Sequence, residues 1–229
     1  MLECSVIFPL ENQLVVYENL ALEYLSETVD CVSRVFSEQE PLACKLGVTA
    51  EDMEPIAFGF SRCALKEGNG VIARDRASGK VVGFAISHDF LCDPMEEVHS
   101  VAPSLSPIMA LLGDLYEVYN RQPLEKGEVY YFNIGGVDHG YYRGLPGSAG
   151  VSGNQVAAQL FEANLAIARQ KRYKKCVAMA TSFFSQSLLR NAGFEEVHRV
   201  DYEGFEFEGS KPFKGMAWHL NCQLLEKDL

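Results

Sequence analysis

None of the seven cysteines forms a CxxC pair with another, their number is odd, and they are widely scattered. Such a pattern predicts neither a disulfide framework nor a zinc site. Cys31, Cys63 and Cys176 lie in apolar stretches, so we expect them to be buried thiols. A protein of this kind fits a reducing compartment.

The sequence also lacks long apolar runs, and it has fewer basic than acidic residues. No apolar stretch reaches the ~20 residues that span a bilayer, and no basic region followed by an apolar run opens the sequence. We therefore expect no signal peptide and a soluble, cytoplasmic protein. The 20 basic and 31 acidic residues give a formal net charge of −11. This balance argues against nucleic acid or an anionic membrane as a partner, and it is compatible with a cationic small substrate.

Nucleotide-binding motifs, internal repeats and low-complexity linkers are absent too. No Walker lysine is present, and no GxGxxG follows a first strand, so nucleotide hydrolysis and dinucleotide binding are poorly supported. What the sequence does contain is 48% hydrophobic residues over 229 positions, enough for a substantial core. We expect a single domain over residues 1–229.

The hydrophobic periodicity predicts a mixed sheet in one α/β domain. We expect helices at residues 22–38, 50–66, 103–121, 155–171 and 183–192. We expect strands at residues 14–18, 71–74, 80–90, 127–137, 176–181, 195–202 and 216–225. Residues 138–154 are rich in glycine and form the longest stretch of turn-forming sequence.

Glu40 follows the helix predicted for residues 22–38, which we expect Pro41 to stop. One face of that helix is apolar and carries Leu22, Leu25, Val29, Val32 and Phe36. A carboxylate beside such a face can be partly desolvated, which raises its pKa and suits it to act as a base near neutral pH. The alternative is that Glu40 is one more solvated acid in an acidic chain.

The C-terminal half runs in the order strand, glycine-rich turn, helix, short strand, helix. A glycine-rich turn before a helix offers free backbone N–H groups and the positive end of the helix dipole, which together suit a pyrophosphate. Residues 150–157 form this turn, and we expect the helix to follow from Val156. The alternative is a turn with a purely structural role.

Three segments resemble the GNAT N-acetyltransferases, and within them the insect-type arylalkylamine N-acetyltransferases. The first follows Phe36 and reads Gln39-Glu40-Pro41-Leu42. The second, residues 152–157, falls at the acetyl-CoA loop, with Ser152 where Arg or Gln is usual and Gln155 where Gly is usual. The third is the run Thr181-Ser182-Phe183-Phe184-Ser185, followed by Gly193-Phe194.

The resemblance implies a single GNAT-like domain with a mixed, mostly antiparallel sheet flanked by helices. It also implies acetyl-CoA as co-substrate, no metal, Glu40 as catalytic base, and Thr181 and Ser185 as hydroxyls that assist the departing thiolate. The backbone of residues 134–137 would stabilise the oxyanion. The expected coenzyme-binding residues are Ile134, Gly135, Gly136, Val137, Ser152, Gly153, Asn154, Gln155, Val156 and Ala157.

The leading hypothesis is acetyl transfer to a primary amine of a small molecule, with an arylalkylamine favoured. The alternatives are a polyamine, an amino acid, a protein amine, or a non-catalytic acyl-CoA binder. A monomer and a homodimer are both compatible with the sequence. His139 is either a second proton acceptor or a solvated loop histidine. Four aromatic residues have two possible roles, in the wall of an amine pocket or in the core: Tyr141, Tyr142, Phe183 and Phe184.

Overall fold

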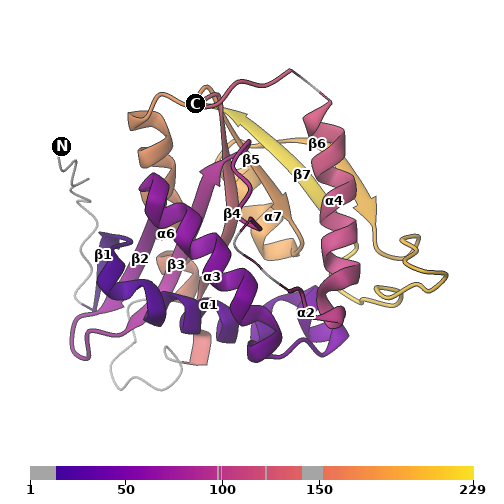
Figure 1. Ribbon diagram of the computed structural model, residues 1–229, viewed down its shortest axis with the longest axis horizontal. Coiled ribbons are helices and arrows are strands. Elements are labelled where there is room, and N and C mark those ends of the chain that lie inside the picture. Colours follow the sequence, from indigo (N-terminus) through magenta and orange to yellow (C-terminus); the bar gives the residue numbers. More distant parts are fainter. Residues whose placement is uncertain (1–13, 97, 99, 122, 141–151) are drawn as a thin grey trace.

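A seven-stranded mixed sheet runs through the protein (Figure 1). The computed structural model describes residues 14–140, except 97, 99 and 122, and residues 152–229. The strand order is β1-β2-β3-β4-β5-β7-β6, and among these described strands only β4 and β5 pair in parallel. The strands are β1 Val15–Asn19, β2 Gly70–Asp75, β3 Val81–Asp89, β4 Val129–Val137, β5 Lys175–Ala180, β6 Glu195–Asp201 and β7 Asn221–Asp228. The predicted mixed, mostly antiparallel sheet is confirmed.

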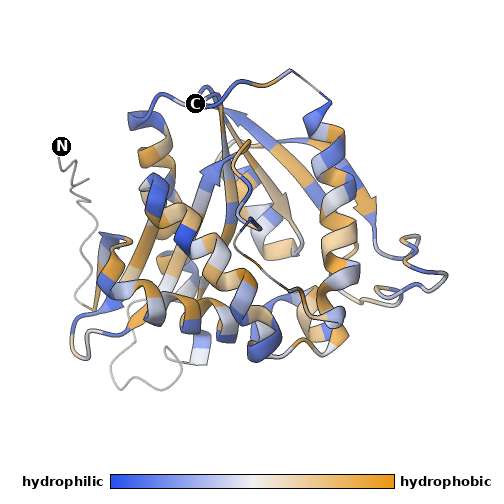
Figure 2. Cartoon of the chain, viewed as in Figure 1, coloured by the Kyte–Doolittle hydropathy of each residue, from blue (hydrophilic) through white to orange (hydrophobic). Residues whose placement is uncertain are grey.

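Helices cover both faces of the sheet. Three of them pack on one face: α1 (Leu25–Gln39), α3 (Ala50–Glu67) and α4 (Ser106–Asn120). On the opposite face lie α6 (Gly153–Gln170) and α7 (Phe183–Asn191). The short helix α2 (Pro41–Leu46) follows α1 directly. Hydrophobic residues gather on the strands and on the helix sides turned toward them, as expected for a layered core (Figure 2).

The helix ends follow from local sequence. Thr49 caps α3 in a reciprocal capping box with Asp52, and Gly68 ends the helix at φ +64°. Ser182 caps α7 in the same way with Ser185. These boundaries agree with those expected from the sequence.

Hydrophobic packing on the two faces explains most of the buried residues. The large cluster on the α1, α3 and α4 side is centred on Phe84, Ile86 and Leu111, and smaller clusters lie under α6 and α7. Gly136 has a packing role, because a Cβ there would lie 2.8 Å from Val35 Cγ1. A side chain at this point would push α1 away from the sheet. Cys31, Cys63 and Cys176 are buried, as predicted.

Two expectations about the elements were wrong in detail. The helix predicted from residue 22 begins as a 3-10 turn, Leu22–Tyr24, and Leu22 is 74% exposed rather than part of the apolar face. The expected stop before Pro41 is confirmed, because α1 ends at Gln39, and the fixed φ of Pro41 also starts α2. The last strand starts at Asn221 rather than 216, since residues 216–220 belong to the connection from β6.

Candidate active site

The two parallel strands β4 and β5 separate part-way along their length. They pair only over Val129–Phe132 and Lys175–Ala178, although β4 continues to Val137. From residue 134 onward β4 still pairs with β3. In the described chain no strand covers the other edge of β4 beyond Phe132, so its N–H and C=O groups can pair with an extended ligand.

A β-bulge lies at this point of separation. Ile86 pairs with Ile134 and the next residue, Ser87, pairs with Phe132, so Asn133 is the extra residue of β4. Asn133 lines a cavity, and its Nδ2 is buried without a hydrogen-bond partner. Unpaired buried amide groups are rare, because each costs desolvation free energy. Asn133 is therefore a candidate for contact with a ligand.

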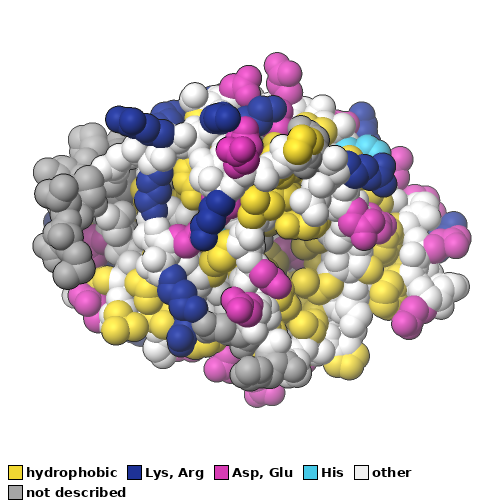
Figure 3. Space-filling view, turned by 45° about the horizontal axis from the view of Figure 1, so that its top comes forward, with side chains coloured by type: hydrophobic (Ala, Val, Ile, Leu, Met, Phe, Trp, Pro, Cys, Tyr) yellow, Lys and Arg dark blue, Asp and Glu magenta, His cyan; other side chains and the backbone are white. Residues whose placement is uncertain are grey.

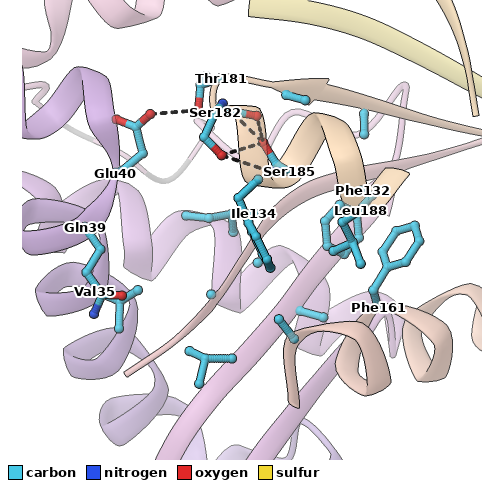
Figure 4. A pocket seen from close by; sticks show the side chains of 18 of the residues that line it. Val35, Gln39, Glu40, Phe132, Ile134, Phe161, Thr181, Ser182, Ser185 and Leu188 are labelled. Carbon is cyan, nitrogen blue, oxygen red and sulfur yellow. Dashed lines mark hydrogen bonds between the residues drawn. The ribbon is translucent and has the colours of Figure 1, made fainter. Parts of the chain in front are cut away.

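The cavity has a volume of about 320 Å³ and is lined from both faces of the sheet (Figure 4). Val35, Phe36, Gln39 and Glu40 contribute from α1 and its exit, whereas Leu160 and Leu188 contribute from α6 and α7. The walls between these two groups of helix residues are formed by Ile134–Val137 of β4 and Ala178–Ala180 of β5. Two molecules that enter from opposite faces of the sheet can meet in such a cavity.

Glu40 occupies the junction between α1 and α2 in an extended conformation, φ −77° and ψ 125°. Its Oε2 accepts a hydrogen bond of 2.6 Å from the backbone N–H of Ala43, so Glu40 is the N-cap of α2. Its Oε1 accepts a hydrogen bond of 2.7 Å from Thr181 Oγ1. Only 9% of Glu40 is exposed, which rules out a freely solvated acid.

Burial raises the pKa of Glu40 above its ordinary value, while the hydrogen bonds from Ala43 and Thr181 act in the opposite direction. Desolvation, which disfavours the charged carboxylate, is the largest of these effects. The carboxylate is thus a stronger base than a solvated glutamate. It is also the sole carboxylate among the described residues that line the cavity.

Thr181 and Ser185 both line the cavity but are held differently. Thr181 follows the last residue of β5, and its carbonyl oxygen accepts a hydrogen bond of 2.7 Å from Tyr202 Oη. Ser185 belongs to the capping box of α7, where its Oγ lies 2.9 Å from Ser182 Oγ and donates to Ser182 O. The structure therefore brings Glu40 and Thr181 into direct contact and places Ser185 beside Ser182.

The predicted coenzyme residues divide into two groups. Ile134–Val137 and Ala157 line the cavity, whereas residues 152–156 lie at the end of α6 and do not line it. The helix expected at residues 155–171 begins two residues earlier, because α6 starts at Gly153 with Ser152 as N-cap. Val156 is fully buried and packs in the core. The predicted turn residues 141–151 lie outside the described part of the chain.

The N-terminus of α6 is capped by its own side chains. Ser152 Oγ accepts a hydrogen bond from the backbone N–H of Gln155, and Gln155 Oε1 accepts one from the backbone N–H of Ser152. This capping box satisfies two of the donors that a pyrophosphate would otherwise use. The first-turn N–H groups of Gly153 and Asn154 remain outside it.

Two histidines lie at the cavity, one of them missed by the sequence analysis. His139 lines the cavity and packs near Gly153, where a Cβ would be 3.1 Å from His139 Cδ2. His219 was assigned to a strand but lies in the β6–β7 connection, where its Nδ1 accepts a hydrogen bond from Phe183 N. Partial burial lowers the pKa of His219. No local sequence pattern predicts that His219 lies at the cavity. Asn133 could have been noticed, because it is a polar residue inside a strand rich in aromatic residues.

The predicted aromatic residues differ in their surroundings. Phe184 lines the cavity, whereas Phe183 is largely exposed. Further aromatic walls come from Phe36, Phe132 and Phe161. Tyr141 and Tyr142 lie outside the described residues.

Comparison with solved structures identifies the architecture. The C-terminal condensation domain of Ebony, in complex with beta-alanyl-dopamine, matches with a TM-score of 0.78 and 17% identity, covering 94% of this chain and 99% of that one. A mosquito arylalkylamine N-acetyltransferase like 5b matches with a TM-score of 0.73 and 22% identity over 94% of this chain and 100% of that one. The chain has the GNAT fold.

The same fold occurs in proteins named for other amines. The polyamine N-acetyltransferase of Drosophila melanogaster, which forms N-acetylagmatine, matches with a TM-score of 0.69 and 15% identity, covering 94% of this chain and 100% of that one. No protein-family model matches the sequence. The separated strands β4 and β5 lie at the centre of this sheet, and the shared fold does not select a substrate.

The face of the described residues seen in Figure 3 does not single out a partner. On the face shown in Figure 3, acidic and basic side chains are interspersed with hydrophobic ones around a hollow. Among the described helices, none combines the length and the apolar character needed to cross a membrane.

Proposed function

We propose that this protein transfers an acetyl group from acetyl-CoA to a primary amine of a small molecule, with an arylalkylamine as the preferred acceptor. The observation that carries the proposal is the buried Glu40 carboxylate, hydrogen-bonded to Thr181 at the wall of a cavity that passes between β4 and β5. Solved structures with the same fold include amine N-acetyltransferases, which supports the reaction class.

The donor and the acceptor would enter from opposite faces. The unpaired edge of β4 suits the amide groups of the pantetheine arm, which can hydrogen-bond as an added strand does. The α1 side holds Glu40 and suits the amine. The thioester would then lie between them, at the bulge of β4.

The chemistry requires the free base of the amine, because a protonated amine cannot attack the thioester carbonyl. Glu40 accepts the proton that the nitrogen loses, and its raised pKa makes it a suitable acceptor near neutral pH. Backbone N–H groups on the free edge of β4 stabilise the oxyanion that forms on the carbonyl oxygen. The C–S bond then breaks and the thiolate leaves.

Thr181 is the proposed proton donor to the departing thiolate. Its hydroxyl contacts Glu40 directly, so the hydroxyl can give its proton to sulfur and regain one from protonated Glu40. The proton lost by the amine thus reaches the thiol, and neither residue changes its charge over the cycle. Ser185, which also lines the cavity, is the second candidate donor to the thiolate.

The walls of the cavity favour an apolar amine. Phe36, Phe132, Phe161 and Phe184 offer aromatic and hydrophobic contact. A polyamine carries a second cation, and Glu40 is the sole carboxylate that the described lining residues offer. An arylalkylamine needs just one carboxylate.

The second candidate function is a non-catalytic acyl-CoA binder, suggested by a loop with Ser152 where Arg or Gln is usual and Gln155 where Gly is usual. One thiol-release assay separates the two functions. The protein is mixed with acetyl-CoA and, in turn, tryptamine, putrescine, spermidine and an amino acid. Thiol release with the highest kcat/KM for tryptamine supports the proposal. A higher value for a polyamine overturns the substrate class, and binding of acetyl-CoA without turnover of any amine favours the binder.

A further inference from the structure

Two cysteines far from the cavity lie side by side. Cys63 of α3 and Cys92 of the segment after β3 are 29 positions apart in sequence, yet their Sγ atoms are 2.8 Å from each other. Cys63 is 7% exposed and Cys92 is partly exposed. Neither residue lines the cavity described above, so their chemistry is separate from acetyl transfer.

The backbone holds both cysteines in place. The segment after β3 packs tightly on α3, because a Cβ at Gly59 would lie 2.5 Å from the carbonyl oxygen of Pro94. Before it, the backbone N–H of Cys92 donates to Asp89 O at 2.8 Å. The contact between the two sulfurs is therefore fixed by the fold on both sides.

Glu67 completes the cluster, with a carboxylate oxygen within 4.8 Å of both sulfurs. The geometry favours a disulfide over a metal ion. Two thiolates on one tetrahedral Zn²⁺, each at about 2.3 Å, are separated by roughly 3.8 Å, well beyond the observed distance. Glu67 Oε2 also already accepts hydrogen bonds from Asp89 N and Asn69 Nδ2.

We propose that Cys63 and Cys92 are a modification site that forms a reversible disulfide by exchange with a low-molecular-weight disulfide such as oxidised glutathione. Cys92, the more exposed thiol, loses its proton and attacks one glutathione sulfur, which releases one glutathione thiolate. Cys63 then loses its proton, attacks Cys92 Sγ and expels the second glutathione thiolate. The two protein thiols are oxidised, and the glutathione disulfide is reduced to two thiols.

Burial and the nearby Glu67 charge raise the pKa of both thiols, so thiolate is scarce and the first attack is slow. The resulting bond would tie α3 to the segment that leads toward α4. It would also restrict the unfolded chain and thereby stabilise the fold.

The test incubates the full chain with oxidised glutathione or with dithiothreitol, followed by alkylation, intact mass and peptide mapping. We expect the loss of two hydrogen atoms, a peptide linking Cys63 to Cys92, and a Tm rise of about 5–10 °C that dithiothreitol reverses. Cys44→Ser, which removes an exposed cysteine, should leave the link intact. Cys92→Ser should abolish both the link and the Tm rise.

Three results would overturn the proposal, and all can be seen in the unmutated protein. The first is a stable glutathione adduct on Cys92 with Cys63 still open to alkylation after denaturation. The second is no change in either thiol at equilibrium with excess oxidised glutathione. The third is a bound Zn²⁺ that protects both thiols in the reduced protein, which would make the cluster a metal site.

Discussion

Thr181 Oγ1 donates a hydrogen bond of 2.7 Å to Glu40 Oε1, which connects the end of β5 to the junction of α1 and α2. A threonine hydroxyl has one proton, and here that proton points to the carboxylate. Thr181 can therefore protonate a thiolate only if Glu40 returns the proton to it. The two residues should act as a unit in catalysis.

Replacing Thr181 tests this coupling. Thr181→Val keeps the shape but removes the hydroxyl, and we expect kcat to fall by roughly ten- to a hundredfold because the thiolate leaves without its proton donor. Thr181→Ser should retain most of the activity. Steady-state kinetics with an arylalkylamine measure both variants. If Thr181→Val and Thr181→Ser have equal kcat values, Thr181 has a structural role and Ser185 becomes the candidate donor.

Glu40→Gln removes the base while preserving the N-cap, because the amide oxygen can still accept from Ala43 N. We expect kcat/KM to fall by roughly a hundred- to ten-thousandfold with little change in coenzyme affinity. The acidic limb of the pH profile, which reports ionisation of Glu40, should disappear. A variant that keeps full turnover between about pH 6 and 9 would show that another group, such as His139, accepts the proton.

The same variant makes a prediction about stability. Because the pKa of Glu40 is raised in the folded protein, the folded state binds its proton more tightly than the unfolded state. Protonated Glu40 therefore stabilises the folded state at pH values below its unfolded pKa. This stabilisation is lost as pH rises from the unfolded pKa through the folded pKa. Glu40→Gln should be more stable than the native chain above that window and lack this pH dependence. Urea unfolding at a series of pH values measures the difference.

Asn133 combines a cost for the fold with a position in the cavity. We expect Asn133→Leu to increase the free energy of unfolding, because it removes the buried Nδ2 that lacks a partner. The same substitution should lower kcat/KM by roughly tenfold through the loss of a hydrogen bond to a substrate. Urea unfolding measures the change in stability, and steady-state kinetics measure the change in kcat/KM. Unchanged kcat/KM would mean that Asn133 contacts no substrate.

Much of the fold could be predicted from the sequence because its signals are local. The Thr49 capping box, Gly68 after α3, and Ser182 before α7 fix helix ends through neighbouring residues. The local pattern beside Pro41 left Glu40 open as a base or a solvated acid, and the resemblance of residues 39–42 to the family motif pointed to the base. Its burial, which raises its pKa, and its hydrogen bond with Thr181, 141 positions away in sequence, carry no local signal.

The remaining features depend on long-range packing. The bulge at Asn133 follows from how β3 pairs with β4. His219 reaches the cavity only because the β6–β7 connection lies against the start of α7. The Cys63–Cys92 contact joins α3 to a segment 29 residues away, so the cysteine spacing gave no indication of it.

Gly136 tests the packing of α1 against the sheet. Gly136→Ala would place a Cβ 2.8 Å from Val35 Cγ1 and 2.9 Å from Phe84 Cζ, and we expect a loss of about 1–3 kcal/mol in the free energy of unfolding. Gly113→Ala is the matched control, because nothing lies within 4 Å of a Cβ at this position in α4. The control should gain roughly 0.5–1 kcal/mol. Equal stability of the two variants would contradict the tight approach of α1.

Ser152 tests whether the coenzyme reaches the N-terminus of α6. Asp and Asn both cap helices as well as Ser does, so Ser152→Asp and Ser152→Asn should keep α6 intact. They differ in charge alone. If the pyrophosphate binds here, Ser152→Asp should raise the Kd for acetyl-CoA by about tenfold through charge repulsion, whereas Ser152→Asn should leave it nearly unchanged. Calorimetry measures both values. Equal affinity of the two variants would show that the capping box excludes the pyrophosphate and that the donor is held by its pantetheine arm along β4.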